Sequence, residues 1–399
     1  MYRIRNYETR RAARVLVLSS ALGEQERMLE LGKFMRLCNE VGVSELELVQ
    51  EATEADFVFL ATGGVEHMFL EALERGVSPA VYAPRPSNAF AALNEVRAYL
   101  RARHKSLMVF GADELDLASW LEVASARRLL KEAKIVSFGE KAPWLVASEP
   151  AESLLRERLG LSVIREDWSA LGWENYESKK ELLEQWQAFP KAGVESERLE
   201  RCIQLSSALL DYAQRERCDI VLAGCFPLLS QHVSACLALS DLLDNGILAV
   251  CENDLCSAVS MLFLDFLGLC SSPPWMANLV SIEGDCIELH HCTIAKGCVK
   301  AAELLTHFES QDAAALGGQY IMDEILVMRV DERLEKLYLC RGEVLERRVN
   351  VSGCRTAIRV CLEHALREPL GNHHIVIPAN DTARIKAFAR LMQMEVVES

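Results

Sequence analysis

The chain has 399 residues, which at roughly 150 residues per domain indicates two or three domains, and half of its residues are hydrophobic, enough for a core in each. The 43 Lys and Arg residues against 58 Asp and Glu residues give a net charge of -15. Because such a field repels nucleic acids and anionic membrane surfaces, we expect no nucleic-acid partner and no membrane partner.

No targeting or membrane segment is predicted. The apolar run at 15–18 is too short for the hydrophobic part of a signal peptide, and the stretch at 258–269 is interrupted by Asp265. We therefore expect a cytoplasmic protein. In that compartment the 14 cysteines, none of them in a CxxC motif, are expected to be reduced and mostly buried as small apolar side chains.

The first two thirds of the chain alternate short β-rich runs with amphipathic stretches, which is typical of βαβ units around a parallel sheet. A helix over 255–267 is expected to begin after Asp254 as its N-cap and to end at Gly268. Strands are predicted at 15–18, 57–61, 80–83, 107–110, 134–138, 220–223 and 247–250, and further helical segments at 25–41, 67–75, 88–103 and 176–217.

The pattern changes after Pro273 and Pro274, where β-like runs follow one another with few helices between them. These runs lie at 275–281, 285–293, 320–330, 337–339 and 374–377. The sequence therefore predicts an α/β protein with two Rossmann-like parallel-sheet domains, over 1–130 and 131–272, followed by a β-rich C-terminal domain over 273–399.

The first candidate site is a turn directly after the strand at 57–61. The sequence there lacks a GxGxxG motif and has no phosphate-binding GxxxxGK, but Gly63 and Gly64 allow a ligand close to the backbone, and Glu66 opens the following helix. A tight βα turn without a ligand explains these residues equally well.

The second candidate is a carboxylate at the end of a buried strand. Glu252 follows the strand at 247–250, and ligands of open parallel sheets bind at the carboxyl ends of strands. Glu252 is therefore a candidate metal ligand or base. Asp254 is a candidate acid or base as well, although its position favours a helix N-cap.

Two His-His pairs complete the candidate site. Strand alternation sends His290 and His291 to opposite faces, and the same holds for His373 and His374, so one residue of each pair can face a given site. Imidazole nitrogen with carboxylate oxygen is a common ligand set for Mn²⁺, Fe²⁺ or Zn²⁺. A structural role for each single histidine is the alternative.

Several short motifs in a fixed order resemble the L-fucose and L-arabinose isomerase-like family, in particular its shorter, divergent members. The resemblance spans nearly the whole chain. In order, the motifs are TGGVE at 62–66, PRPSNA at 84–89, NE at 94–95, CEND at 251–254, WMAN at 275–278, HCT at 291–293, CRT at 354–356 and GNHH at 371–374.

The resemblance implies a metal-dependent aldose-ketose isomerase with two Rossmann-like domains and a β-rich C-terminal domain. The family holds a divalent ion, usually Mn²⁺, with carboxylates and a late histidine, which match Glu252 and one of His373 or His374. Its sites lie between subunits of a trimer-based hexamer, so a homotrimer or homohexamer is expected. The residues expected to bind the sugar are Gly63, Gly64, Glu66, Ser87, Asn88, His291 and Arg355. The loops at Gly63–Gly64 and Ser87–Asn88 are expected to complete the site of a neighbouring subunit.

One position departs from the family. Where the isomerases have a second metal-binding aspartate, this chain has Asn278, a neutral amide that is not a base and binds a cation weakly. Asp254 is a possible substitute for that carboxylate. Two alternatives to the isomerase thus stay open: a sugar-binding or regulatory relative without turnover, and a metal-dependent lyase or epimerase that needs one carboxylate base.

Overall fold

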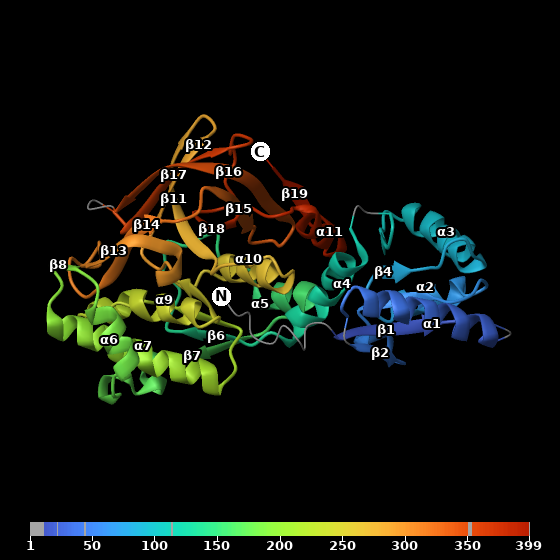
Figure 1. Cartoon of the computed structure of the whole chain (residues 1–399), viewed down its shortest axis with the longest axis horizontal. Coiled ribbons are helices and arrows are strands. Elements are labelled where there is room, and N and C mark those ends of the chain that lie inside the picture. The colour runs from blue at the N-terminus through green and yellow to red at the C-terminus, as the bar shows by residue number, and fades with distance from the viewer. Residues whose placement is uncertain (1–11, 22, 44, 113–114, 350–352, 399) are drawn as a thin grey trace.

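Two parallel sheets and a β-barrel follow one another along the chain (Figure 1). The computed structural model describes residues 12–398 except 22, 44, 113–114 and 350–352. Among these residues, no helix has both the length and the apolar composition that crossing a membrane requires.

The N-terminal sheet has five strands in the order β2-β1-β3-β4-β5, and every pairing within it is parallel. Helices connect β1 to β2, β3 to β4 and β4 to β5, while a short 3-10 turn (Ala52–Glu54) lies between β2 and β3. The strands are β1 (Ala12–Leu18), β2 (Glu45–Val49), β3 (Phe57–Leu60), β4 (Ala80–Tyr82) and β5 (Met108–Val109), and the helices are α1 (Glu24–Glu40), α2 (Glu66–Glu74) and α3 (Asn88–Arg101). Helix α4 (Leu117–Glu132) then leads to the second sheet.

The second sheet has four parallel strands in the order β10-β9-β6-β7. Its strands are β6 (Ile135–Phe138), β7 (Val163–Glu166), β9 (Ile220–Ala223) and β10 (Leu248–Cys251). Its helices are α5 (Glu152–Leu154), α6 (Lys180–Gln187), α7 (Ser196–Arg215), α8 (Phe226–Leu229), α9 (Cys236–Asp244) and α10 (Leu255–Phe266). The carboxyl end of β10 is the edge that carries Glu252.

The prediction of one long helical region over 176–217 was wrong. The structure has two helices, α6 and α7, separated by the short strand β8 (Lys191–Ala192). Pro190 disfavours helical backbone at the residue before it, and Gly193 adopts a left-handed conformation with φ of 75°. Strand β8 pairs with β13 (Val299–Leu305) of the C-terminal region, a contact that local periodicity cannot reveal.

The C-terminal region forms a closed barrel of six strands in the order β15-β18-β11-β12-β17-β16, with β16 pairing back to β15 and with β19 at the outside. Strands β13 and β14 form a small sheet with β8, and one helix, α11 (Ala383–Leu391), follows the barrel. The remaining strands are β11 (Trp275–Glu283), β12 (Cys286–His291), β14 (Ala315–Tyr320), β15 (Glu324–Val330), β16 (Lys336–Val349), β17 (Thr356–Leu362), β18 (His373–Pro378) and β19 (Glu395–Val397).

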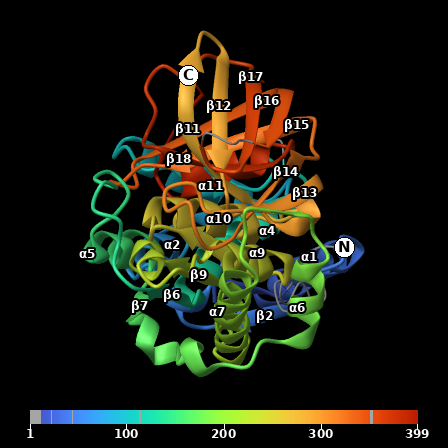
Figure 2. The same cartoon turned by 90° about the vertical axis from the view of Figure 1, so that its left-hand side faces the viewer.

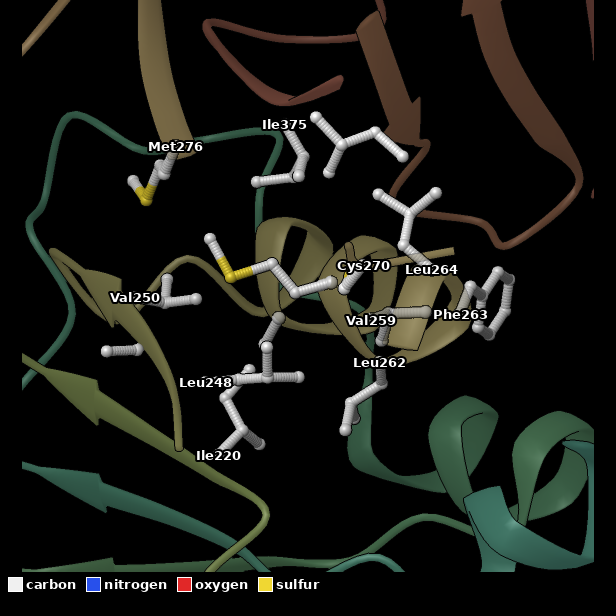
Figure 3. Close-up of a cluster of buried hydrophobic side chains, with 14 of the residues drawn as sticks. Ile220, Leu248, Val250, Val259, Leu262, Phe263, Leu264, Cys270, Met276 and Ile375 are labelled. Atoms are coloured by element: carbon white, nitrogen blue, oxygen red, sulfur yellow. The ribbon is translucent and has the colours of Figure 1, made fainter. Parts of the chain in front are cut away.

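Helix α10 joins the second sheet to the barrel. All twelve of its residues are buried, as expected for a helix that is apolar all round. Figure 3 shows its side chains between Leu248 and Val250 of β10 on one side and Met276 and Ile375 of the barrel on the other. In Figures 1 and 2 the barrel accordingly lies on one side of the second sheet, with α10 between them. The outer barrel wall therefore faces the carboxyl end of β10.

The predicted architecture of two parallel sheets followed by a β-rich region is confirmed. The N-cap and the end of α10 are confirmed too, since Asp254 Oδ1 accepts from the Ser257 amide at 2.7 Å and Gly268 has φ of 68°. The Rossmann-like label and the domain boundaries remain predictions.

Candidate functional site

Glu252 and Asn253 form a strained turn between β10 and α10. Their φ angles are 58° and 55°, in the left-handed region that non-glycine residues seldom occupy. The Asn253 amide stabilises the turn by donating to Gly139 O at 2.8 Å and Phe138 O at 3.2 Å at the end of β6. Such strain persists where the surroundings enforce it, often at functional sites. At Glu252 and Asn253 the left-handed backbone makes the turn from β10 into α10 differ from an ordinary helix N-terminus.

The Glu252 side chain is held by an indole. Trp144 Nε1 donates to Glu252 Oε2 at 2.8 Å. Burial raises the pKa of Glu252, while the nearby His373 and the Trp144 hydrogen bond partly oppose this shift. Trp144 packs edge-to-face on Phe226, with ring centroids 4.4 Å apart, so one wall of the site is aromatic. Trp144 has no local sequence signal for this role, because its link to Glu252 spans 108 residues.

Asp254 is fully buried and has three partners. Its Oδ1 caps α10, and its Oδ2 lies 2.8 Å from His373 Nδ1 and 3.3 Å from Arg329 Nη1. Burial alone raises the pKa of Asp254, but the Arg329 charge and the His373 hydrogen bond outweigh it and hold the pKa below its usual range. Asp254 is therefore an ionised anchor inside the protein, out of reach of a substrate.

His373 points from the barrel toward Glu252. Because a carboxylate only accepts hydrogen bonds, His373 Nδ1 donates to Asp254, and in the neutral ring Nε2 carries the lone pair. His373 Nε2 lies 3.8 Å from Glu252 Oε1, is buried, and has no hydrogen-bond partner among the described residues. A carboxylate behind the imidazole of a metal-binding histidine is a common way to fix its orientation.

His291 lies beside His373, with ring centroids 5.7 Å apart. Its Nδ1 accepts from the Cys292 amide at 3.0 Å, which places the proton of the neutral ring on Nε2. Burial keeps the pKa of His291 well below its usual value, so the ring is neutral. His291 Nε2 has no hydrogen-bond partner among the described residues, and in this tautomer it carries an N–H. The ligand atoms of Cys251, Glu252 and His291 lie within 4.8 Å of one another, so His291 also belongs to a group of potential metal ligands.

His374 lies on the other face of β18. Its Nδ1 donates to Asn372 O at 3.1 Å, and its ring stands perpendicular to Tyr338 of β16 with centroids 5.7 Å apart. Burial lowers its pKa to about 3. Of the two adjacent histidines, the structure thus brings His373 and not His374 to Glu252.

Asn278 shares a face with His373. The two residues are cross-strand neighbours in the pairing of β11 with β18, so their side chains project to the same side. Asn278 Oδ1 accepts from Asn372 Nδ2 at 2.6 Å. Asn278 also lines a cavity of about 670 Å³ outside the barrel, together with residues that include His290, Phe308, Glu309, Arg348 and Cys354.

Arg355 holds the segment at 306–309, which borders this cavity, by hydrogen bonds. It donates to Thr306 O at 2.7 Å and to Thr306 Oγ1 at 3.1 Å, and it is buried. The segment carries His307, whose Nε2 lies 3.2 Å from Glu309 Oε2, and the His307 ring packs against Phe226. His307 and Glu309 were not among the predicted site residues, because neither lies in a recognisable motif.

The remaining predicted residues lie at the carboxyl edge of the N-terminal sheet. Ser87 caps α3 by accepting from the Phe90 amide at 3.1 Å, and Glu66 begins α2. A Cβ added to Gly63 would lie 2.9 Å from Asn88 Cβ, so the two loops touch. The structure therefore brings Gly63, Gly64, Glu66, Ser87 and Asn88 to a different sheet from the one that ends at Glu252.

Fold and site together define an α/β protein with two parallel sheets and a closed barrel, in which Glu252 and two buried histidines, His291 and His373, meet where the second sheet meets the barrel. No family model matches the chain. The chain is similar to sulfoquinovose isomerase of Alkalicoccus urumqiensis, with 23% identity over 218 residues, 50% of this chain and 48% of that protein. The match thus spans about half the length of this curated relative, which is named as an isomerase of a sugar.

Proposed function

We propose that this protein is a metal-dependent aldose-ketose isomerase of carbohydrate metabolism, built on two Rossmann-like domains and a barrel. The observation that carries the proposal is the alignment of Asp254, His373 and Glu252, in which a buried carboxylate orients an imidazole toward a second carboxylate. The similarity to sulfoquinovose isomerase supports a sugar as the substrate class.

The donor set fits a divalent ion such as Mn²⁺. Glu252 offers Oε1 and His373 offers the lone pair of Nε2, a carboxylate oxygen and a neutral imidazole that suit Mn²⁺, Fe²⁺ or Zn²⁺. When bound, the ion supplies a Lewis acid that stabilises negative charge on the sugar oxygens. Asp254 contributes by holding the His373 ring, since it is already saturated by its own three partners.

The other groups bind and move protons. In the proposed reaction Glu252 takes the proton from C2 of the aldose and returns it to C1, while the hydroxyl proton passes from O2 to O1, so substrate and product have the same composition. His291 Nε2–H donates to a sugar oxygen. The rings of Trp144 and Phe226 limit the access of water on one side of Glu252.

A sugar-binding protein without turnover is the second candidate. Asn278 favours it, because its amide stands on the face of His373, at the position where the resemblance to the fucose and arabinose isomerases implies an acidic residue. The two functions predict the same bound ligand class and differ in whether a carbon-bound proton is exchanged.

We further propose that the loops at Gly63–Gly64 and Ser87–Asn88 serve a neighbouring subunit's site in a homotrimer or homohexamer. Support comes from their contact with each other at the edge of the N-terminal sheet, away from the sheet that bears Glu252. Light scattering measures the mass directly. A stable monomer at micromolar concentration would contradict the shared site.

The function is tested with the purified protein after chelation and reloading with Mn²⁺. Aldoses, with sulfoquinovose among them, are incubated in deuterated water and followed by proton NMR for ketose formation and for loss of the C2 proton. Turnover by the parent protein and none by Glu252→Gln, with normal turnover by the exposed control Glu40→Gln, supports the isomerase. Saturable sugar binding without either signal supports the second candidate and rejects the first.

A further inference from the structure

A second group of potential metal ligands lies next to the Glu252 site, where Cys292 directly follows His291. Cys236, Cys292 and His307 each offer one ligand atom, and these three atoms all lie within 4.8 Å of one another. All three residues are buried. None of them belongs to the proposed Glu252–His373 ligand set, so the two groups of donors are distinct.

The three residues come from separate elements. Cys236 is the first residue of α9, Cys292 follows β12, and His307 follows β13. The chain therefore gives no CxxC or similar spacing, which is why the sequence analysis predicted no cysteine-based metal site. Barrel closure and the docking of α9 bring the donors together.

Two thiols already lie in contact. The Sγ atoms of Cys236 and Cys292 are 3.4 Å apart, and Cys354 is hydrogen-bonded to Cys292. As thiolates, Cys236 and Cys292 would balance the charge of a divalent cation, and Cys354 lies beside Cys292.

The cluster lies close to a cavity that is open to solvent. His307 is buried, whereas the side chain of its neighbour Glu309, 3.2 Å from His307 Nε2, is 45% exposed. Glu309 and Cys354 both line the cavity of about 670 Å³ outside the barrel. The cavity therefore reaches Cys354, which is hydrogen-bonded to Cys292, and carries an acidic side chain beside it.

We propose that Cys236, Cys292 and His307, with Cys354 beside them, bind a thiophilic divalent cation of the Zn²⁺ class at a site separate from the Glu252–His373 site. Two sulfurs and an imidazole nitrogen match the ligands of tetrahedral zinc, while the oxygen and nitrogen donors of Glu252 and His373 suit Mn²⁺. One chain then carries a hard and a soft cation side by side, where the barrel meets the second sheet.

Co²⁺ is the probe, because thiolate coordination gives it intense near-ultraviolet charge-transfer bands that oxygen and nitrogen ligands do not. The full-length protein is purified with reductant, stripped with a chelator and titrated anaerobically with Co²⁺, and Zn²⁺ is then added as a competitor. We expect bands with the intensity of at least two thiolates, bleached by Zn²⁺, in the parent protein and in Glu252→Gln.

Three variants locate the site. Cys292→Ser is expected to lose the charge-transfer bands, and His307→Ala to shift them and weaken Co²⁺ binding by at least tenfold, while Cys38→Ser, a buried cysteine of the N-terminal region, keeps them. Circular dichroism checks each fold, and His307→Ala keeps the test decisive where Cys292→Ser does not fold. Absence of thiolate bands in the folded parent, or a Cys236–Cys292 disulfide in place of the site, overturns the proposal. Because Glu252→Gln spares this site, failure here is distinguishable from failure of the isomerase assignment.

Discussion

Nδ1 of His373 lies 2.8 Å from Oδ2 of Asp254, and this hydrogen bond joins the barrel to the first turn of α10. The same carboxylate caps α10 and pairs with the fully buried Arg329. A residue that the sequence suggested as an acid or base thus positions another residue's imidazole. The orientation of His373 toward Glu252 depends on it.

Asp254→Asn is expected to weaken Mn²⁺ binding by about 10–100-fold, the usual effect of losing an outer partner of a metal-binding histidine. It is also expected to destabilise the fold by about 3–5 kcal/mol, because Arg329 keeps its buried charge without a counter-ion. Asparagine is itself a good N-cap, so the cap survives. Mn²⁺ titration by electron paramagnetic resonance and urea unfolding measure the two effects.

The control is Asp116→Asn, at the N-cap of α4, where Asp116 Oδ1 accepts from the Ser119 amide at 2.8 Å and no histidine is bound. Its Mn²⁺ affinity should equal that of the parent. Equal affinity for Asp254→Asn would mean that His373 is oriented by something else.

His373→Gln and His374→Gln separate two adjacent histidines. His373 faces Glu252, so its loss should reduce Mn²⁺ affinity by more than the roughly 10–100-fold expected for an outer partner. His374 faces Tyr338 on the opposite side of β18, so its variant should lose stability and keep the metal. Metal analysis of the folded variants checks this, and the reverse result would place the ion inside the barrel.

Asn278→Asp tests whether the amide limits the chemistry. In the parent protein Asn278 Oδ1 accepts from Asn372 Nδ2 at 2.6 Å, and Asn278 Nδ2 donates to Cys354 Sγ at 3.8 Å. An aspartate beside His373 keeps the first hydrogen bond and loses the second, weak one. Mn²⁺ affinity should rise, and isomerisation should appear or increase by about 10²- to 10⁴-fold if a missing base was limiting. The exposed Asn39→Asp serves as the charge-matched control. A lower rate in Asn278→Asp would instead favour the amide as a hydrogen-bond donor to substrate.

Gly224→Ala tests the packing behind the Glu252 turn. An added Cβ would lie 2.1 Å from Glu140 O and 2.9 Å from Asn253 Nδ2, so the strand ends must move apart. We expect a loss of about 1–3 kcal/mol in the free energy of unfolding. Weaker Mn²⁺ binding should accompany it, because Asn253 directly follows Glu252.

The same substitution, Gly32→Ala inside α1, is expected to raise the free energy of unfolding instead of lowering it. The nearest atom to an added Cβ there is Arg36 Nη1 at 4.0 Å, and alanine favours a helix over glycine by about 0.5–1 kcal/mol. Urea unfolding of both variants gives the comparison. An unchanged free energy of unfolding in Gly224→Ala would show that Glu140 and Asn253, after β6 and β10, can move to accommodate a Cβ.

The sequence by itself determined the features that depend on neighbouring residues. Strand-helix alternation predicted two parallel sheets, and the position of Asp254 before an apolar run predicted the cap of α10, because both rest on local hydrogen bonding and periodicity. Glu252 was recognisable for the same reason, as a carboxylate at a strand end.

Only the tertiary structure decided which residues meet across the chain. Alternation put His373 and His374 on opposite faces, but barrel closure and the docking of α10 determined that His373 faces Glu252. Trp144, His307 and the Cys236–Cys292 contact likewise come from segments far apart in sequence. Their proximity follows from packing of the barrel on the second sheet. Burial of apolar surface drives that packing, and it is non-directional, so the local sequence does not indicate which polar atoms will be brought together.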